Sequence, residues 1–419
     1  MVFRKRTPPG LAKEMFLEHI TPIERREEIA IEDAVGRILA DDIVSEIDVP
    51  DHRRSAMDGY AVFAHDTTGA SEASPVLLQE GIDCVRVHTG SPVPDRMDAV
   101  VVIEDTLPAG DGVDERVVEV HSAVHPNKNI SLIGEDVSRG DRVFTMGHQV
   151  RACDVAMLAM LGITDVQVFA RPRVAIIPTG SELAPRAGII EDGKIRETNG
   201  LMVGLYVEEW GGVPDYRGIV IDDPDLIEKE ILTSVDGGAD MIILCGGTSV
   251  GARDYVPGAI DSLGDLLVHG VALSPGKPAA LGMIGQTPVL SLPGYPVACL
   301  IASIEFARPA ILKLGRVPEK PERLVRARLG SKIASRIGYL TYTRVALEDG
   351  VAHPVMTSGA GILSSVTRSD GFVIIKEELE GLDCGDLVDV SGSSKIVRGH
   401  GIEARGTSLF DVPSPMTLP

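Results

Sequence analysis

The spacing of apolar and polar residues divides the chain into regions with different periodicities. Between residues 171 and 318, short apolar runs such as RVAIIPTG and ADMIILCGG alternate with longer amphipathic stretches such as NGLMVGLYVEEWG and PDLIEKEILTSVDG. Short apolar runs bounded by glycine or proline indicate buried strands, and the longer stretches indicate helices. The alternation predicts a Rossmann-like α/β domain in which helices cover both faces of a parallel sheet.

The regions on either side are predicted to be richer in β-structure. The first begins with an amphipathic segment and with EDAVGRILADDI (32–43), whose apolar spacing predicts a helix, and it ends in a second expected helix, RACDVAMLAMLGI. Between them, short apolar pieces separated by Gly, Pro and Asp predict a β-rich lobe inserted at about residues 50–143. The last region predicts a small β domain, followed by a tail without periodicity. The predicted boundaries are 1–170, 171–318, 319–395 and 396–419.

Composition narrows the class of protein. A chain of 419 residues exceeds what one hydrophobic core usually supports, and its net charge of −21 argues against a nucleic-acid-binding surface. The five cysteines form no CxxC pair, and Cys245 and Cys299 lie in apolar runs, so buried reduced thiols are expected. The basic start of the chain lacks the apolar stretch of a signal peptide, and no apolar run is long enough to span a bilayer. These features predict a cytoplasmic protein.

The segment MIILCGGTSVGARDY (241–255) is the most informative motif. Its apolar run is typical of a buried strand, and the strand ends in a loop of small residues. The loop offers glycines that let the backbone approach an anionic ligand, hydroxyl groups, and a carboxylate suited to a divalent cation. These residues are Gly246, Gly247, Gly251, Thr248, Ser249 and Asp254.

Four other strand ends in the α/β region carry similar residues. Because the carboxyl ends of strands in an open α/β sheet meet at one edge, all five segments are predicted to converge. The segments are PTGSEL (178–183), the pair Asp222–Asp223, GGTSVGARDY, SPGKPAALG (274–282) and LPGYPVA (292–298). Together they supply Glu182, Asp222 and Asp254 as oxygen ligands and Lys277 as a cation, which suits Mg²⁺ bound with substrate phosphates.

Simpler structural roles also fit single members of this set. A glycine pair at a strand end is most often a turn, and Asp222 and Asp223 stand where they can cap the next helix. Glu182 is suited to the first turn of a helix, whereas Lys277, held between two prolines, favours a positioned role. Spacing excludes two nucleotide-binding motifs. The glycines read GGxxxG rather than GxGxxG, and GSELAP lacks the GK[ST] ending of a Walker loop.

Three motifs in the first 170 residues add candidate groups. RRSAMDGYAVFAHD (53–66) places Asp58 among small residues, a context that aims its carboxylate. HTGSPVP has Thr89 at its turn, and GEDV offers Asp136.

Taken in order, these motifs resemble those of the molybdopterin molybdenumtransferase family, which includes MoeA and the E domain of gephyrin. The matching motifs are SAMDGYAV, TGSPVP with DAVV, GEDV, PTGSEL, GGTSVGARDY, PGKP and LPGxP, spread over residues 10–395. The resemblance implies that adenylyl-molybdopterin is cleaved with Mg²⁺ present and that molybdate is inserted to give molybdenum cofactor and AMP. It also implies a homodimer of four-domain subunits with a MogA-like α/β domain. Molybdopterin adenylyltransferase and apo-molybdoenzymes are the partners it implies.

The resemblance also assigns roles to individual positions. Catalytic roles are implied for Asp58, Glu182, Asp222, Asp254 and Lys277, and the four acids are also the implied Mg²⁺ ligands. Substrate contacts are implied for Thr89, Asp136, Gly246, Gly247, Thr248, Ser249, Gly251, Pro293, Pro296, Arg344, Ser358 and Ser364, with Ser365 in the same SGAGILSS segment as the last two. Arginine suits an oxyanion because its guanidinium donates two parallel hydrogen bonds.

Three positions depart from the family pattern. Ser274 stands where a basic residue commonly precedes PGKP, and in LPGYPVA Tyr295 and Ala298 replace an asparagine and a serine. In the family this lysine and serine contact molybdate, and losing a cation and a hydroxyl weakens an oxyanion site by roughly a few kcal/mol. Arg253 and His269 are candidates to replace the lost charge. The departures leave two alternatives open: a paralogue that handles tungstate, and a non-catalytic scaffold like the gephyrin E domain, which also serves in receptor anchoring.

Overall fold

The chain forms two compact units. The computed structural model describes residues 6–109, 116–247, 255–356 and 359–392. Residues 24–170 make up one unit, here called the inserted unit because the chain on both sides of it belongs to the other. The main unit combines residues 1–23 with 171–419.

A mixed six-stranded sheet is the centre of the main unit. Its strands, in spatial order, are β16 (Val213–Tyr216), β13 (Arg173–Thr179), β17 (Met241–Gly246), β21 (Thr287–Leu292), β20 (Ala280–Ile284) and β18 (Asp265–His269). The first four strands are parallel, as the alternating pattern predicts. However, β20 runs antiparallel to both β21 and β18, so the sheet is not wholly parallel. The difference arises because a short turn joins β20 to β21 as a hairpin, which leaves no room for a crossover helix.

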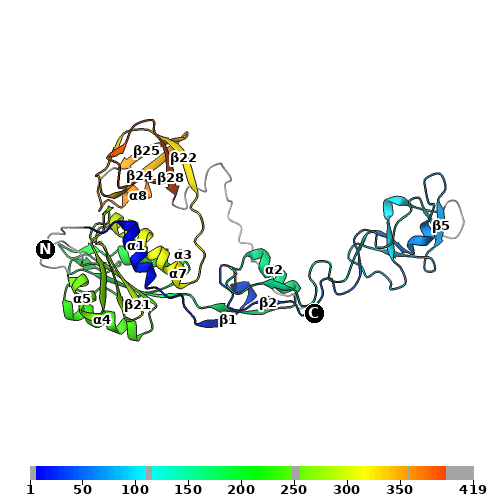
Figure 1. Cartoon of the computed structure of the whole chain (residues 1–419), viewed down its shortest axis with the longest axis horizontal. Helices are drawn as coiled ribbons and strands as arrows, with labels where there is room; N and C mark the ends of the chain where they lie inside the picture. The colour runs from blue at the N-terminus through cyan, green and yellow to red at the C-terminus, as the bar shows by residue number, and fades with distance from the viewer. Residues whose placement is uncertain (1–5, 110–115, 248–254, 357–358, 393–419) are drawn as a thin grey trace, which may run out of the picture. The chain divides into compact units, whose positions relative to one another are not determined.

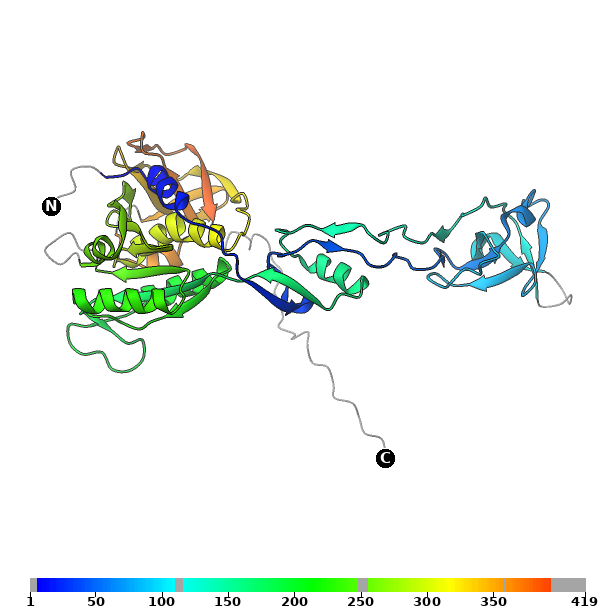
Figure 2. The same cartoon turned by 60° about the horizontal axis from the view of Figure 1, so that its bottom comes forward.

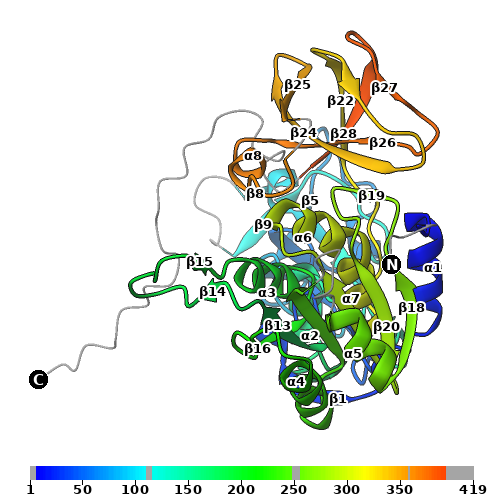
Figure 3. The same cartoon turned by 90° about the vertical axis from the view of Figure 1, so that its left-hand side faces the viewer.

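Helices cover both faces of this sheet (Figures 1 and 3). The helices are α1 (Pro9–Glu18), α3 (Asn199–Glu209), α4 (Pro224–Asp236), α5 (Tyr255–Leu263), α6 (Pro296–Ala302) and α7 (Arg308–Leu314), with a π turn, η4 (Ser303–Ala307), between the last two. On one face, α4 and α5 bury Ile227, Ile231 and Ile260 against Ile242 and Leu244 of the central strand. Helix α3 contacts α6 on the other face. Helices α6 and α7 thus form one long helical segment, interrupted only by the π turn.

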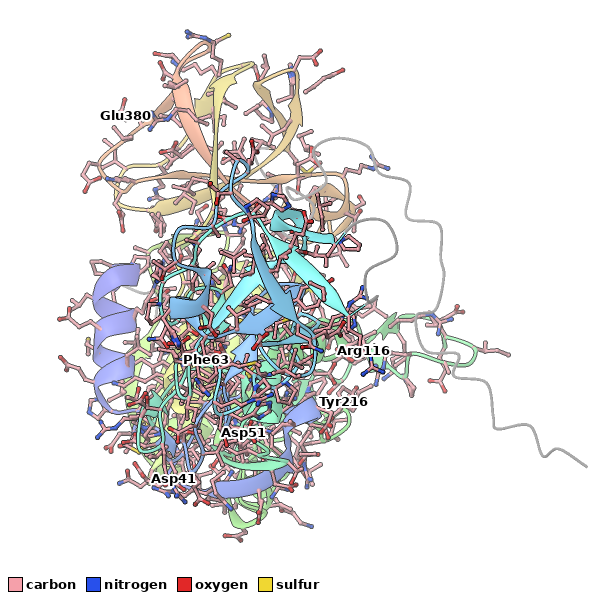
Figure 4. All side chains as sticks on the ribbon, turned by 90° about the vertical axis from the view of Figure 1, so that its right-hand side faces the viewer. Asp41, Asp51, Phe63, Arg116, Tyr216 and Glu380 are labelled. Carbon is pink, nitrogen blue, oxygen red and sulfur yellow. The ribbon has the colours of Figure 1, made fainter. Side chains whose placement is uncertain are left out.

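The C-terminal part of the main unit is a small β-barrel, which confirms the predicted β domain. Its strands are β19 (Leu273–Ser274), β22 (Leu324–Leu329), β24 (Leu340–Glu348), β25 (Val351–Met356), β26 (Gly371–Ile375) and β28 (Leu387–Gly392). An additional pairing of β24 with β26 closes the sheet. Two short strands, β23 (Ile333–Ala334) and β27 (Gly381–Leu382), pair beside it, and the N–H of Ser335 donates to the carbonyl of Glu380 at 2.7 Å. Glu380 is labelled in Figure 4. The remaining elements of the main unit are β14 (Leu183–Ala184), β15 (Ile195–Arg196) and α8 (Ser364–Thr367).

The inserted unit is rich in β-structure. Its strands are β1 (Arg26–Ala30), β2 (Ile43–Val44), β3 (Arg54–Ser55), β4 (Gly59–Val62), β5 (Val76–Gln79), β6 (Cys84–Val87), β7 (Ala99–Val102), β8 (Thr106–Pro108), β9 (Val117–Val120), β10 (Ile130–Ser131), β11 (Arg142–Phe144) and β12 (Asp165–Phe169). The sheets β6-β4-β7 and β5-β9-β8 share a core that contains Val62, Leu78, Val101 and Val118. The chain enters and leaves this lobe along two adjacent antiparallel segments, paired by β2 with β11 and β3 with β10 (Figure 2).

A buried carboxylate fixes the start of α2 (Ala152–Met160) in the inserted unit. Asp154 accepts hydrogen bonds from Nη2 of Arg151 at 2.7 Å and from its backbone N–H at 2.8 Å, and its Oδ2 lies 2.7 Å from Nε2 of His148. These partners, with Arg151 the largest contributor, hold the pKa of Asp154 well below its ordinary value. The carboxylate is therefore ionised when the unit is folded.

The helix predicted over 32–43 is wrong. Only a 3₁₀ turn forms there, η1 (Ile31–Asp33), and Ile38 and Leu39 instead form β-bridges with Gln149 and Val168. Tertiary pairing overrides the helical spacing because Leu39 is fully buried against Val168 and its neighbours in this core.

Two predictions from composition agree with the structure. All five cysteines are free, and Cys245 and Cys299 are buried. Within the described part of the chain, no helix is long and apolar enough to cross a membrane.

Candidate functional site

A cavity of about 1000 Å³ lies at the carboxyl edge of the mixed sheet, where the α/β domain meets the C-terminal β-barrel. Three of the five predicted strand-end segments contribute to its wall through described residues: PTGSEL, SPGKP and LPGYP. The pair Gly246–Gly247 from a fourth segment also lines it. The predicted convergence is thus observed for these four segments.

The two glycines are needed where they stand. Gly246 is paired with Thr179 on the neighbouring parallel strand, and a Cβ on Gly246 would lie 2.2 Å from the Thr179 carbonyl oxygen. A Cβ on Gly247 would lie 2.7 Å from Cγ2 of Val256. Both residues also have positive φ, +114° and +65°, a region that side chains disfavour. Packing against the neighbouring strand and helix therefore requires glycine at both positions, and both residues line the cavity.

The PGKP segment reaches the same edge by a route that differs from the predicted one. It precedes β20 rather than following a parallel strand. Because β20 runs antiparallel to β21, its amino end lies at the carboxyl edge of the parallel strands. Ser274 and Lys277 consequently both line the cavity.

Among the described residues, positive side chains outnumber carboxylates in the lining. They are Arg6, Arg196, Lys277 and Arg344, set against two carboxylates, Glu182 and Glu197. Arg344 is only 2% exposed, and burial lowers its pKa. Burial is also the main cause that lowers the pKa of Lys277, to which Arg6 and Arg336 add. An acidic chain has thus formed a locally positive cavity, which suits an anionic ligand.

One of the two carboxylates is already engaged. Glu197 is 1% exposed, accepts from the backbone N–H of Gly200, and accepts from the hydroxyl of Tyr216 at 3.1 Å. Tyr216, labelled in Figure 4, ends β16 and also lies under the guanidinium of Arg186. Burial, with Glu197 next, raises the pKa of Tyr216 to about 12. Glu182 has no such partner among the described residues and is the carboxylate available to a ligand.

The Asp222–Asp223 pair serves the local backbone. Oδ1 of Asp223 accepts from the N–H groups of Asp225 and Leu226 at 3.0 and 3.1 Å, which confirms the capping role. Oδ2 of Asp222 accepts from the N–H of Ser181 at 3.0 Å, and Asp222 does not line the cavity.

A second group of predicted residues lies in the inserted unit. Oδ1 of Asp58 accepts from both the backbone N–H of Thr89, at 2.7 Å, and its hydroxyl, at 3.0 Å. These two hydrogen bonds, the backbone one first, hold the pKa of Asp58 below its ordinary value. Asp136 lies on another turn of the unit, where its N–H donates to Val49. The structure therefore joins Asp58 to Thr89 in a single site with an exposed carboxylate.

The remaining predicted residues divide into three groups. Pro293, Pro296 and Arg344 line the cavity, together with the three departures, Ser274, Tyr295 and Ala298. Ser364 and Ser365 do not, and the Ser365 hydroxyl donates to the carbonyl of Ile362 at 2.6 Å. Thr248, Ser249, Gly251, Asp254 and Ser358 lie outside the described residues, as does Arg253. His269 lies on β18, away from the cavity lining.

Sequence reasoning missed several lining residues, among them Asn199, Glu197 and Arg6. Asn199 begins α3 and donates from Nδ2 to the carbonyl of Gly294 at 2.8 Å, and Glu197 lies just before the same helix. A polar TNG sequence at the expected helix start was the only local indication. Nothing in the sequence around Arg6 indicated a contact with residues more than 260 positions away.

The fit to Mg²⁺ rests on few protein ligands. Among the described residues, no group of three His, Cys, Asp or Glu side chains is arranged to hold a metal ion. Mg²⁺ usually takes only one or two carboxylates and completes its shell with water and substrate phosphates. The available Glu182 carboxylate meets that smaller requirement.

Comparisons with known proteins cover nearly the whole chain. Three family models match: the MoeA N-terminal region (domain I and II) at residues 8–162, the "Probable molybdopterin binding domain" at 175–313, and the MoeA C-terminal region (domain IV) at 326–391. A protein of Methanocaldococcus jannaschii provisionally assigned to molybdopterin biosynthesis is 36% identical over 90% of this chain and 94% of its own. A molybdopterin molybdenumtransferase of Haemophilus influenzae is 30% identical over 90% of this chain and 96% of its own length. The crystal structure of a molybdopterin biosynthesis MoeA protein from Pyrococcus horikosii superposes with a TM-score of 0.79 at 33% identity, over 93% and 99% of the two chains.

Proposed function

This chain belongs to the MoeA family of molybdenum cofactor biosynthesis, and on that basis we propose that it inserts molybdate into adenylyl-molybdopterin and releases AMP. The observation that carries the proposal is the cavity at the sheet edge, whose described lining combines the Gly246–Gly247 backbone with four positive side chains. A pterin nucleotide with a phosphoanhydride presents several negative charges, and molybdate is itself an anion. A locally positive cavity in a chain of net charge −21 fits such ligands.

The cavity residues are proposed to have different roles according to their chemistry. The backbone of Gly246 and Gly247, which lines the cavity, is proposed to contact phosphate oxygens. Lys277 and Arg344 are the cations proposed to hold the oxyanion, with Arg344 suited to bidentate contact. Pro293 and Pro296 shape the wall where α6 begins.

Mg²⁺ is proposed as the metal cofactor. Glu182 is the described carboxylate that would hold it, and Asp254, which follows the glycine loop in sequence, is the proposed second. When bound, the ion would neutralise charge on the phosphate oxygens during cleavage. Asp222 is left with its hydrogen bond to Ser181 and is proposed to support the loop that carries Glu182.

Asp58 and Thr89 are proposed to act in the same reaction. The two hydrogen bonds from Thr89 orient the Asp58 carboxylate and keep it ionised, so it can accept a proton or order the attacking group. Asp136, Ser358 and Ser364 are retained as proposed substrate contacts. A homodimer is the proposed assembly, with molybdopterin adenylyltransferase and apo-molybdoenzymes as partners. We place the protein in the cytoplasm, in keeping with its five free cysteines.

AMP release from adenylyl-molybdopterin, followed with molybdate and Mg²⁺ present, tests the assignment. Asp58→Ala should abolish AMP release while the melting temperature stays unchanged, because the Asp58 side chain is exposed. Glu72→Ala removes another exposed acid of the inserted unit and serves as the control. Full turnover by Asp58→Ala would remove Asp58 from the mechanism, and a wild-type protein that releases no AMP would refute the proposed activity.

Tungstate is a second candidate substrate because Ser274, Tyr295 and Ala298 all line the cavity. Competition between molybdate and tungstate in cofactor reconstitution decides between them: equal or better use of molybdate rejects the tungstate reading. A non-catalytic scaffold predicts a different result. It should give no heat on titration with either adenylyl-molybdopterin or molybdate.

A further inference from the structure

Arg6 lines the cavity although it lies far from every motif in sequence. We propose that Arg6 supplies the positive charge that Ser274 fails to provide in this chain, and that Arg6 and Lys277 together bind the free tetrahedral oxyanion. The inference rests on the proposed function for the identity of that anion, molybdate or its close analogue tungstate. It assigns the compensating role to Arg6 instead of Arg253 or His269.

Backbone pairing holds Arg6 beside the PGKP segment. The next residue, Thr7, forms a parallel β-bridge with Val271: its N–H donates to Gly270 at 3.2 Å, and its carbonyl accepts from Ala272 at 2.8 Å. Ser274 lies on the same short stretch of chain, three residues beyond Val271. The amino-terminal segment thus runs alongside the strand that carries the departure, and residue 6 is placed where its long side chain reaches the same cavity.

The side chain of Tyr339 brings the two cations together. Cζ of Arg6 lies 5.4 Å from the centre of the Tyr339 ring, and Nζ of Lys277 lies 4.9 Å from it. Tyr339 directly precedes β24, whose first residues pair with Leu273 and Ser274. Tyr339 is buried, with 8% of the residue exposed. Cation–π contact of this kind positions the charged groups without neutralising them.

The charge balance around Lys277 favours an anion there. Among the residues that the structure describes, no carboxylate forms an ion pair with Lys277, and its Nζ lies over the Tyr339 ring. Arg6, Lys277 and Arg336 all lie over the Tyr339 ring, and both arginines act to lower the pKa of Lys277. An oxyanion between Arg6 and Lys277 would relieve the repulsion between these like charges and accept charge-assisted hydrogen bonds from both. Arg336 contacts the same ring at 5.1 Å but does not line the cavity.

The role of Arg6 is tested by removing its charge and placing a positive charge at residue 274 with Ser274→Lys. Titration calorimetry with sodium molybdate and sodium tungstate is carried out on the full chain and on Arg6→Ala, Arg6→Gln, Arg336→Ala and the double variant Arg6→Ala/Ser274→Lys. Loss of one charged hydrogen-bond donor should weaken oxyanion binding by about 10- to 100-fold in both Arg6 variants. The double variant should recover to within roughly threefold of wild type, and Arg336→Ala should bind like wild type. Arg6→Gln keeps most of the side-chain stem, so it tests the charge even if Arg6→Ala loses stability.

Two results would overturn the assignment. The first is wild-type oxyanion affinity in Arg6→Gln. The second is a loss in the Arg6 variants that Ser274→Lys does not repair or that Arg336→Ala matches, since that would reflect general charge or packing. In steady-state AMP release, the KM for molybdate should rise while the KM for adenylyl-molybdopterin stays unchanged; a rise only in the latter also contradicts the proposal. If wild type binds the oxyanion but releases no AMP, the proposed activity fails while the titrations still decide the role of Arg6.

Discussion

Gly246→Ala tests the steric requirement for glycine at the edge of the cavity. The added methyl group would lie 2.2 Å from the Thr179 carbonyl oxygen and 3.2 Å from its Oγ1, whereas Cβ atoms rarely approach within 3.0 Å of another atom. The backbone at Gly246 also has φ of +114°, which costs a non-glycine residue about 1–3 kcal/mol. Forcing β13 and β17 apart adds overpacking of about 1–3 kcal/mol. The expected loss of folding free energy is therefore about 2–6 kcal/mol, or roughly 5–20 °C in Tm.

Gly294→Ala is the matched control because Gly294 lines the same cavity without being crowded. The nearest atom to a Cβ there would be Cα of Gly246, at 3.8 Å, and φ is not in the left-handed region. The free energy of unfolding of Gly294→Ala should stay within about 0.5 kcal/mol of the wild-type value, so its Tm should change little. Thermal unfolding followed by circular dichroism compares the three proteins at equal concentration. If Gly246→Ala melts with the wild type and Gly294→Ala, the steric argument for the glycine loop is wrong.

Three other outcomes follow from the charges and the departures. Asp154→Asn should cost the inserted unit about 2–4 kcal/mol, because a buried, multiply bonded carboxylate is replaced. Because folding lowers the pKa of Asp154, its contribution in the wild type is complete above the unfolded pKa of about 3.9 and is lost as the pH falls from there toward the folded pKa. Urea unfolding between pH 7 and pH 3 should therefore show a steeper fall in stability below pH 4 for wild type than for the variant, and equal pH dependence would contradict this role of Asp154. Thr89→Val removes one hydrogen bond that lowers the pKa of Asp58, so the acid limb of kcat/KM for AMP release should move to higher pH, and an unmoved limb would disprove the link. Restoring the family residues with Tyr295→Asn/Ala298→Ser should lower the KM for molybdate by about threefold to tenfold through an added hydroxyl contact, and no change would show that these positions do not face the anion.

The local sequence predicted most of the secondary structure of the α/β domain. The period of apolar residues reports which face of an element is buried, and that period is set within a single strand or helix. Helix α4 begins after Asp223 because its carboxylate caps two N–H groups, and this too is a local property. The prediction failed at 32–43, where long-range pairing of Ile38 and Leu39 prevails over helical spacing.

The direction of β20 was not predictable from periodicity. An apolar strand has the same pattern whether it runs parallel or antiparallel to its neighbour. The short Gly285 turn was the only local indication of a hairpin there, and its positive φ of +58° is compatible with one. The reversed direction nevertheless brings Lys277 to the predicted edge.

The sequence by itself determined the family, the order of the domains and the chemical types of the candidate groups, since these depend on motifs and their spacing. Only the tertiary structure decided which groups share a cavity. It placed Glu182 and Lys277 in the lining, left Asp222 outside it, and added Arg6. The physical reason is that such neighbours are fixed by β-pairing between segments distant in the chain, here Thr7 with Val271. No local pattern records that pairing.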